Sequence, residues 1–484
     1  MDKSKLIFGN KIAAKVVKKA EKVKKKYIRK FGDDSNRIYK LGSCENNTLG
    51  PILGIQNITL GDGNEQIDRE KGIVIGCIRM GYGHYRIALA MASAARSMGY
   101  VPYWFDLHAY QETTGGKVIT YINKLYSFGS KLSQRFKIFN KLFWETLNRG
   151  EFIRLSCNAV DQKVSELMTT VYKGLPEDIP FIATHVWPSQ AAIHAGLKKV
   201  VNAIPDNFPM ALHLSEGAIH TVQTPSAFLG YKMLVGMDGD NLLRPIPEGE
   251  IYEVGHYVDH EIVANIEMDC NKRLERIKNK EARRILLTIG GAGAQKDIFV
   301  KIIREIMPFI KENKAVLFIN IGDHKDVWNE MCKEIEGFED TIDKHFDDWT
   351  DTVAFAEEAL DKPQKGIHVF KTKDIFAAVY TTNLLMRAAD IMITKPSELA
   401  FYPVPKLLIR RIGGHEAWGA ITAAEIGDGT IELDSVDRAF QMLRLMIEKD
   451  EILTMFCNKI MKANQAGIYN GAYKAVKLAV EGKI

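Results

Sequence analysis

The sequence has few cysteines and no long apolar run. Its six cysteines are scattered over 484 residues and form no CxxC pair, so neither a zinc–cysteine site nor a disulfide framework is expected. No stretch of about 18 apolar residues occurs, which argues against a transmembrane helix. Lysines interrupt the apolar residues near the N-terminus, which argues against a secretory signal. Together these absences favour a protein of the reducing cytoplasm.

Familiar catalytic signatures are also missing. No P-loop, GxSxG or protein-kinase motif occurs, and no grouping of His, Asp and Glu has metal-ligand spacing. We therefore expect no catalytic metal and no cofactor. What is present, 46% hydrophobic and 26% charged residues, is typical of a globular protein, and the length predicts two domains.

The basic charge is concentrated at the N-terminus. Residues 1–31 carry 12 lysines and arginines against two acidic residues, although the whole chain has a net charge of only +5. The spacing predicts a helix that could lie on an anionic membrane surface through residues 10–31, bind nucleic acid, or pack on its own protein. Packing on the protein is the commonest of these outcomes, and without a recognised motif nucleic acid is not expected as a partner. The apolar stripe of this helix is formed by Ile12, Val16, Ala20, Val23, Tyr27 and Phe31.

A strand–turn–helix–strand pattern occupies residues 71–106. An apolar run over 72–78 leads into a turn with two glycines, and a helical period then runs to Gly99 before a second apolar run over 101–105. Residues 32–70, rich in Gly, Asn and Asp, are expected to be loops with room for one hairpin. Residues 114–150, with interleaved aromatics and lysines, are expected to form two helices.

Strands and helices alternate over most of the chain, which predicts an α/β protein. A charged helical segment over 259–283 is the expected linker between two such domains. We expect an N-terminal extension (1–70), an N-terminal Rossmann-like domain (71–260), a C-terminal Rossmann-like domain (261–460) and a C-terminal helix (461–484), for which packing back on the N-terminal domain is one arrangement. The expected strands are 181–185, 199–204, 218–223 and 251–255 in the first domain, and 285–289, 315–319, 368–370, 391–393 and 406–409 in the second.

Histidines follow several of these strands. His84 opens a helix after Gly81, Tyr82 and Gly83, where a neutral imidazole is either a general base or part of the turn. Asp206 is either an alternative base, an orienting partner or a helix cap. His185 and His213, at other strand ends, are expected to be structural or to line a substrate.

A glycine-rich turn follows the first strand of the second domain. Such a turn lets backbone N–H groups approach a diphosphate at a helix N-terminus, and the alternative is a tight turn without a ligand. The residues are Gly290, Gly291, Ala292, Gly293 and Ala294.

These motifs together resemble the two-domain GT-B glycosyltransferases of family 28, over roughly residues 72–430. The family comprises the diacylglycerol galactosyltransferases and the N-acetylglucosaminyltransferase of the peptidoglycan lipid intermediate. The matching segments are GYGH (81–84), FIATHVWPS (181–189), AIPD (203–206), VGHYV (254–258), GGAGA (290–294), IGD (321–323), ADIMITK (389–395) and GHE with GA (414–416 and 419–420).

The resemblance implies a GT-B fold with an interdomain cleft and an inverting, metal-independent transfer from a UDP-sugar to a hydroxyl acceptor such as diacylglycerol. It implies His84 as the base and Gly81, Tyr82, Gly83 and His185 on the acceptor side. Besides the glycine turn, the implied donor-binding residues are Gly322, Lys395, Ser397, Glu398, Gly414, His415 and Glu416.

Two departures from the family pattern keep other functions open. The segment 395–405 is too short for both a glycine turn and a full helix, because its prolines limit any helix near Glu398 to about one turn. His415 stands where the family has glutamine. The alternatives are a sugar-nucleotide 2-epimerase, for which Glu416 and Asp206 are the candidate carboxylates, and a non-catalytic nucleotide-sugar binder.

Overall fold

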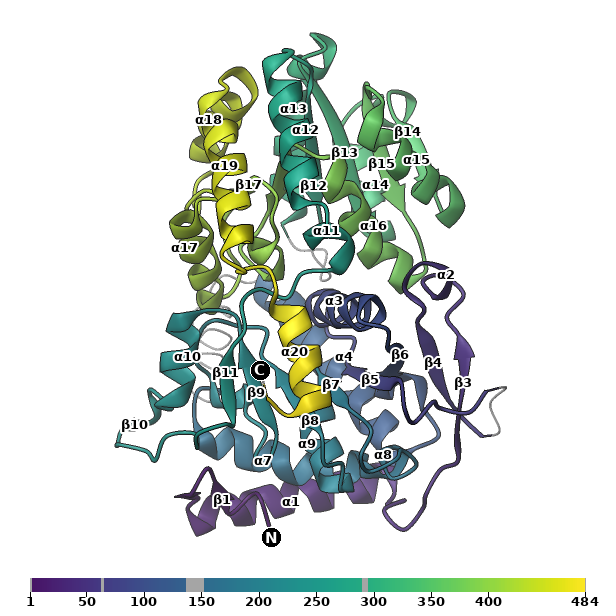
Figure 1. Cartoon of the computed structure of the whole chain (residues 1–484), viewed down its shortest axis with the longest axis vertical. Coiled ribbons are helices and arrows are strands. Elements are labelled where there is room, and N and C mark those ends of the chain that lie inside the picture. The colour runs from purple at the N-terminus through teal and green to yellow at the C-terminus, as the bar shows by residue number, and fades with distance from the viewer. Residues whose placement is uncertain (1, 62–64, 136–151, 290–294, 484) are drawn as a thin grey trace. The chain divides into compact units, whose positions relative to one another are not determined.

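The computed structural model describes residues 2–61, 65–135, 152–289 and 295–483 (Figure 1). They form two compact units. The first unit comprises Met1–Met80, Ile87–Asp259 and Asn470–Ile484, and the second comprises Gly81–Arg86 and His260–Tyr469. The mixed α/β class with two Rossmann-like units is confirmed, because each unit is built on a largely parallel sheet flanked by helices.

The first unit contains an eight-stranded sheet in which all neighbouring strands are parallel except β3 and β4. Every residue of β5 is buried, as expected for a strand covered by helices on both faces. In spatial order the strands are β11 (Ile251–Glu253), β9 (Ile219–Val222), β8 (Val200–Ala203), β7 (Phe181–Ala183), β5 (Gly72–Cys77), β6 (Val101–Asp106), β4 (Gln56–Leu60) and β3 (Leu41–Glu45).

The helices of the first unit come from both terminal regions of the chain as well as from its middle. They are α1 (Ala14–Phe31), α2 (Gly50–Leu53), most of α3 (Gly83–Ser97), α4 (Thr114–Arg135), α7 (Leu155–Ser165), α8 (Thr169–Tyr172), α9 (Val186–Ala195), α10 (Pro225–Lys232) and α20 (Gly471–Glu481). The two-stranded ladder of β1 (Leu6–Ile7) with β2 (Asn10–Lys11) and the strand β10 (Met237–Asp240) lie outside this sheet. The second half of the two-helix expectation for 114–150 falls outside the described residues.

The region 32–70 is more ordered than the loop expected from its composition. Its hairpin is β3–β4, and β4 extends the sheet by pairing in parallel with β6. This segment is therefore part of the first unit's sheet. Its strands are polar and half-buried at the sheet edge, so they carry little of the apolar signal that marks a central strand.

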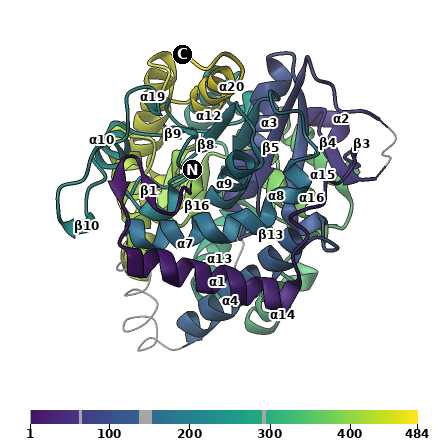
Figure 2. The same cartoon turned by 90° about the horizontal axis from the view of Figure 1, so that it is seen from below.

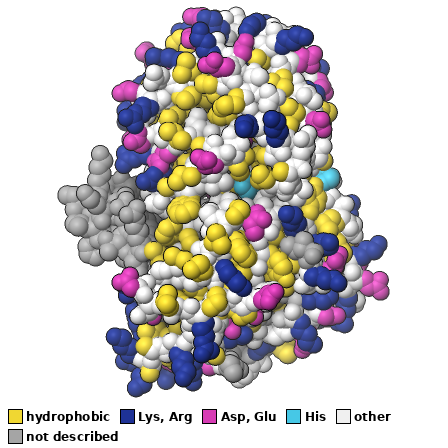
Figure 3. All heavy atoms as spheres, turned by 60° about the vertical axis from the view of Figure 1, so that its left-hand side comes forward, with side chains coloured by type: hydrophobic (Ala, Val, Ile, Leu, Met, Phe, Trp, Pro, Cys, Tyr) yellow, Lys and Arg dark blue, Asp and Glu magenta, His cyan; other side chains and the backbone are white. Residues whose placement is uncertain are grey.

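Helix α1 packs on the first unit through its apolar stripe. Val23, Tyr27 and Phe31 contact one buried cluster, while Ile12 and Val16 contact another. Figure 2 shows α1 running beside α7, against which it packs. The stripe is thus covered by the chain itself, and it is the lysine-bearing faces that meet solvent. Lys and Arg side chains gather at the lower edge of the face drawn in Figure 3, where Figure 1 places α1.

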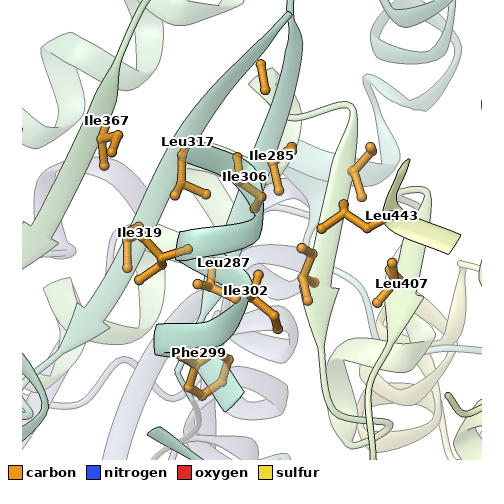
Figure 4. Close-up of a cluster of buried hydrophobic side chains, with 14 of the residues drawn as sticks. Ile285, Leu287, Phe299, Ile302, Ile306, Leu317, Ile319, Ile367, Leu407 and Leu443 are labelled. Carbon is orange, nitrogen blue, oxygen red and sulfur yellow. The ribbon is translucent and has the colours of Figure 1, made fainter. Parts of the chain in front are cut away.

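The second unit contains a six-stranded parallel sheet. Its core is an aliphatic cluster in which side chains of β12, β13 and α13 interdigitate (Figure 4). In spatial order the strands are β14 (Asp343–Phe346), β15 (Ile367–Lys371), β13 (Ala315–Gly322), β12 (Arg283–Thr288), β16 (Ile391–Thr394) and β17 (Lys406–Leu408).

The helices of the second unit begin where a linker was expected. Helix α12 packs on α19 and buries Arg273 and Arg276, so the segment 259–283 is mostly an element of this unit. The segment was expected to be the interdomain linker, but its Arg273 and Arg276 make buried hydrogen bonds within the second unit. The helices are α11 (His260–Val263), α12 (Ile266–Lys278), α13 (Lys296–Lys311), α14 (Lys325–Glu334), α15 (Trp349–Asp361), α16 (Ile375–Ala388), α17 (Ala417–Ile426), α18 (Val436–Glu448) and α19 (Glu451–Gln465).

The chain returns to the first unit at its end. Asn470 forms a bridge with Tyr257, and α20 then packs on β7 and β8. None of the helices in the described part of the chain is long and apolar enough to cross a membrane.

Candidate functional site

The candidate site lies at the carboxyl edge of the second unit's sheet. The chain leaves central strand β12 for β13 on one side, and later returns to place β16 on the other side of β12. Such a switch point is where ligands bind in open α/β sheets. The turn after β12, with the predicted Gly290, Gly291, Ala292, Gly293 and Ala294, lies outside the described residues. The neighbouring turns after β13, β16 and β17 are described.

The turn that carries His84 belongs to this unit and is anchored on the end of β13. The Tyr82 hydroxyl donates to the carboxylate of Asp323 and accepts the backbone N–H of Asp323 at 3.0 Å. Gly322 makes this approach possible, because its φ is +57° and a Cβ there would lie 2.3 Å from the Tyr82 hydroxyl oxygen. The ring of His324 lies 5.6 Å from that of Tyr82.

Arg86 anchors the same turn on α16 and on the segment after β16. Its side chain is only 2% exposed and donates through Nη1 to the amide oxygen of Asn383 and to the carbonyl of Val379. Its Nε lies 3.8 Å from Oε1 of Glu398. A Cβ on Gly83 would lie 3.1 Å from Oε2 of the same glutamate, so this turn and Glu398 are close neighbours.

His84 itself is half-buried in the first turn of α3. Because Nε of Arg86, two residues beyond His84, lies 3.8 Å from Oε1 of Glu398, the backbone of this turn is near a candidate donor residue of the same unit.

The segment after β16 is short, as the sequence predicted. Ser397 is half-buried, and its N–H bonds the carbonyl of Lys395 at 2.8 Å. A single 3₁₀ turn, Glu398–Phe401, follows. The expectation that prolines limit the helix here to about one turn is confirmed.

Lys395, which directly follows β16, forms an ion pair with Glu416, which lies in the 3₁₀ turn Gly414–Glu416 beyond β17. The Glu416 carboxylate also accepts the backbone N–H groups of Ile412 and Gly413 at 2.8 and 3.2 Å. Burial alone would raise the pKa of Glu416, but the charge and hydrogen bond of Lys395 lower it below its usual value. Glu416 is therefore held ionised, which suits a structural or ligand-binding anion better than a proton donor. Gly414 and His415 are half-buried beside it in a 3₁₀ turn, Gly414–Glu416.

The remaining predicted residues lie in the first unit. His185 caps α9, where its Nδ1 accepts the N–H of Trp187 at 3.2 Å. Asp206 follows β8, and its Oδ2 lies 3.0 Å from Nε2 of His213. No helix begins at Asp206, so the cap interpretation is wrong and the carboxylate instead pairs with a buried histidine.

Both halves of the chain match family models. Residues 6–233 match the model described as domain of unknown function DUF6937. Residues 246–480 match the model described as domain of unknown function DUF6938. No curated protein matches the chain.

The chain is similar to solved structures that include a 2-epimerase and a trehalose-phosphate synthase. The UDP-GlcNAc 2-epimerase from Neisseria meningitidis bound to UDP-GlcNAc has 12% identity and a TM-score of 0.41, covering 85% of this chain and 98% of its own. The α,α-trehalose 6-phosphate synthase from Burkholderia multivorans has 11% identity and a TM-score of 0.42, covering 85% and 98%. The S. aureus MnaA–UDP co-structure has 9% identity and a TM-score of 0.41, covering 85% and 95%.

Two residues of the site escaped the sequence reasoning. Arg86 and Asn383 were not singled out, although both are buried polar residues that hold the GYGH turn. A signal for Arg86 existed, since it is a lone charge in a helix that is otherwise apolar as far as Ala95. Its partner Asn383 lies on α16, 297 residues further along the chain, so no local sequence pattern could identify it.

Proposed function

We propose that this protein is an inverting, metal-independent glycosyltransferase that uses a nucleoside-diphosphate sugar, specifically a UDP-sugar. The observation that carries the proposal is the anchoring of the His84 turn in the second unit through Tyr82–Asp323 and Arg86–Glu398. In this proposal the donor binds at the carboxyl edge of the second unit's sheet. The anchored turn keeps His84, the base that deprotonates the acceptor, near that edge. The finer resemblance to family 28 of GT-B enzymes agrees with this arrangement.

The proposed chemistry is a single displacement. His84 takes the proton of the acceptor hydroxyl while that oxygen attacks the anomeric carbon. The bond between the anomeric carbon and the diphosphate oxygen breaks, and UDP leaves with the electron pair. The glycine turn at 290–294 and the start of α13 would stabilise the leaving diphosphate through N–H groups and the helix dipole.

On the donor side, we propose that Glu398 binds the ribose hydroxyls and that Lys395 and Glu416 contact the sugar. The ion pair supports this role, because it fixes a hydrogen-bond donor after β16 beside an acceptor in the 3₁₀ turn Gly414–Glu416. Gly322 keeps the end of β13 open to close approach by Tyr82. His415 would replace the amide hydrogen bonds of glutamine with those of an imidazole.

For the acceptor, we propose a membrane amphiphile such as diacylglycerol, with the protein acting peripherally at the cytoplasmic face of the bilayer. Support comes from the exposed lysines of α1, which would attract anionic headgroups. Since the apolar stripe of α1 is packed on the protein, this attraction would be electrostatic rather than insertive.

One observation favours a second function, that of a nucleotide-sugar binder without transferase activity. The segment after Lys395 holds only a single 3₁₀ turn, Glu398–Phe401, where the family pattern has a full helix.

One experiment tests the proposal against both alternatives. UDP release from UDP-glucose, UDP-galactose and UDP-GlcNAc is measured with and without a lipid extract, for the natural chain, His84→Ala and His108→Gln. His108 is the matched control, since its ring nitrogens bond Thr120 and Asn123 in the first unit. Acceptor-dependent release that is lost only in His84→Ala supports the transferase.

The other outcomes point elsewhere. Tight UDP binding without turnover, weakened at least tenfold in Glu398→Gln, would establish the binder and overturn the transferase. Interconversion of the sugar without an acceptor would establish a 2-epimerase. Absence of both binding and turnover with all three donors would reject a UDP-sugar function.

A further inference from the structure

Two histidines face each other near the edge of the second unit's sheet, on elements that carry none of the candidate site. His345 lies on β14 and His368 on β15, and Nε2 of the first is 3.3 Å from Nδ1 of the second. Both side chains are largely buried, 11% and 8% exposed. They pack among Phe355 of α15 and Phe370 of β15, and the ring of His345 is stacked on Phe370 at 4.5 Å.

In each ring, one nitrogen faces the other histidine and is here called the inner nitrogen: Nε2 of His345 and Nδ1 of His368. The other nitrogen of each ring, the outer one, is fixed as a hydrogen-bond donor. Nδ1 of His345 contacts the carboxylate of Asp351, which is ionised in its usual state and then only accepts hydrogen bonds. Nε2 of His368 lies 2.9 Å from the carbonyl oxygen of Lys365, which also only accepts. Each ring therefore carries its N–H on the outer side.

The inner nitrogens are then left without protons when both rings are neutral. A neutral imidazole has one N–H and one bare lone pair, so two lone pairs would point at each other across 3.3 Å. That arrangement is repulsive unless either a metal cation or an added proton lies between them. The charges around it suit a cation, because Asp351 contacts His345 and the Asp343 carboxylate lies 3.6 Å from Nδ1 of His368.

We propose that His345 and His368 bind one divalent transition-metal ion, such as Zn²⁺, between their inner nitrogens. Bonds of about 2.0–2.1 Å at a tetrahedral angle place two ligand nitrogens about 3.3–3.4 Å apart, which is the separation observed.

The surroundings supply the outer contacts that metal-binding histidines need. A carboxylate or a backbone carbonyl that accepts the second N–H fixes the tautomer and orients the ring, and Asp351 and Lys365 occupy these two positions. No group of three His, Cys, Asp or Glu side chains in the described ranges is arranged to hold a metal. The ion would thus have two protein ligands and complete its coordination with water. The ion would link edge strand β14 to β15 and α15, and it would take no part in the proposed sugar transfer.

Isothermal titration of the full chain, without an affinity tag and after removal of metals with EDTA, tests the proposal with Zn²⁺. Co²⁺ serves as a spectroscopic probe of tetrahedral geometry. We expect one strong site per chain, with affinity reduced at least tenfold in His345→Gln and in His368→Gln. His108→Gln, which removes a histidine elsewhere, is expected to bind as the natural chain does. Far-UV circular dichroism and melting curves of each variant show that the fold is kept.

Asp351→Asn distinguishes a metal ion bound between the two rings from a proton shared between them. The amide can donate to Nδ1 of His345, which moves that ring's proton to Nε2 and lets it donate to His368. The inner lone pair is then lost without removal of either ligand, so Zn²⁺ affinity is expected to fall about 10–100-fold. Overturning results are no Zn²⁺ binding, binding unchanged in both histidine variants, or ¹⁵N spectra in which a proton stays between the rings in the presence of excess Zn²⁺.

Discussion

Tyr82 and Asp323 are joined by two hydrogen bonds, one to the carboxylate and one from the backbone N–H at 3.0 Å. Tyr82→Phe removes both and is expected to lower the free energy of unfolding by about 1–3 kcal/mol, because the ring stays buried while the polar groups of Asp323 lose a partner. Urea unfolding measures this. Tyr39→Phe is the control, since the contact of that hydroxyl with Asp34 is longer, at 3.2 Å. Equal losses in the two variants would contradict a special anchoring role.

Gly322→Ala is expected to be destabilising through the same contact. The new methyl group would meet the Tyr82 hydroxyl oxygen at 2.3 Å, and the φ of +57° is strained for alanine as well. In the double variant with Tyr82→Phe, the loss is expected to be smaller than the sum of the single losses, by at least 0.5 kcal/mol. A double-mutant cycle from urea unfolding measures the difference. Strict additivity would show that the steric contact is not the cause.

His220 is expected to make the protein less stable in mild acid. Burial lowers its pKa to about 4, against the hydrogen bonds to backbone carbonyls that would raise it. Between about pH 6.5 and 4 the unfolded chain therefore binds a proton that the folded chain does not. Stability is expected to fall with falling pH in this window, by up to about 1.4 kcal/mol per pH unit from this group.

The measurement is the free energy of unfolding at several pH values, for the natural chain and His220→Gln. The variant is expected to show a shallower slope between pH 6.5 and 4, although it also loses hydrogen bonds with Ser215 and Glu250. His108→Gln serves as a comparison histidine. An unchanged slope in His220→Gln would assign the acid sensitivity to other groups.

Lys406 and Asp428 form a fully buried ion pair at 2.8 Å, both 0% exposed. Burial lowers the pKa of Lys406 and raises that of Asp428, so desolvation outweighs their attraction. Asp428→Ala leaves an uncompensated buried ammonium and is expected to cost about 3–5 kcal/mol. Replacing both residues by Met and Leu is expected to recover most of that loss, as judged by chemical denaturation. A double variant no more stable than Asp428→Ala would contradict this account.

The exposed lysines of α1 are expected to govern any binding to anionic vesicles. Replacement of Lys15, Lys18, Lys22 and Lys25 by Gln leaves the apolar stripe intact and is expected to weaken co-sedimentation with phosphatidylserine vesicles, at roughly 1 kcal/mol per lysine near the surface. Added salt should act in the same direction. Binding unaffected by both changes would reject an electrostatic contact through α1.

Most of the central strands could be predicted because apolar runs mark them. The run at 315–319, for example, lies in β13, which extends to Gly322. The edge strand β14, with the sequence DKHF, has no such run and was missed, since its pairing with β15 rather than its own apolarity makes it a strand. The prolines after Lys395 correctly limited the next helix to one turn, because that constraint is local.

The site was less predictable than the sheet. The sequence identified Gly81–His84 as a turn, but its membership of the second unit depends on contacts of Tyr82 and Arg86 with residues far along the chain. His84 was named as a candidate base from its place at a helix start, and the donor residues were named mainly by resemblance, whereas Arg86 and Asn383 emerge only when distant side chains are placed together.

The return of α20 to the first unit has a consequence for biosynthesis. Its buried face, including Ala475 and Leu478, packs on β7 and β8, which are synthesised almost 300 residues earlier. Helix α20 can therefore cover this part of the first unit only after the whole second unit has been synthesised. Until then, an apolar surface of the first unit stays exposed on the nascent chain, and a chaperone can bind it during this period.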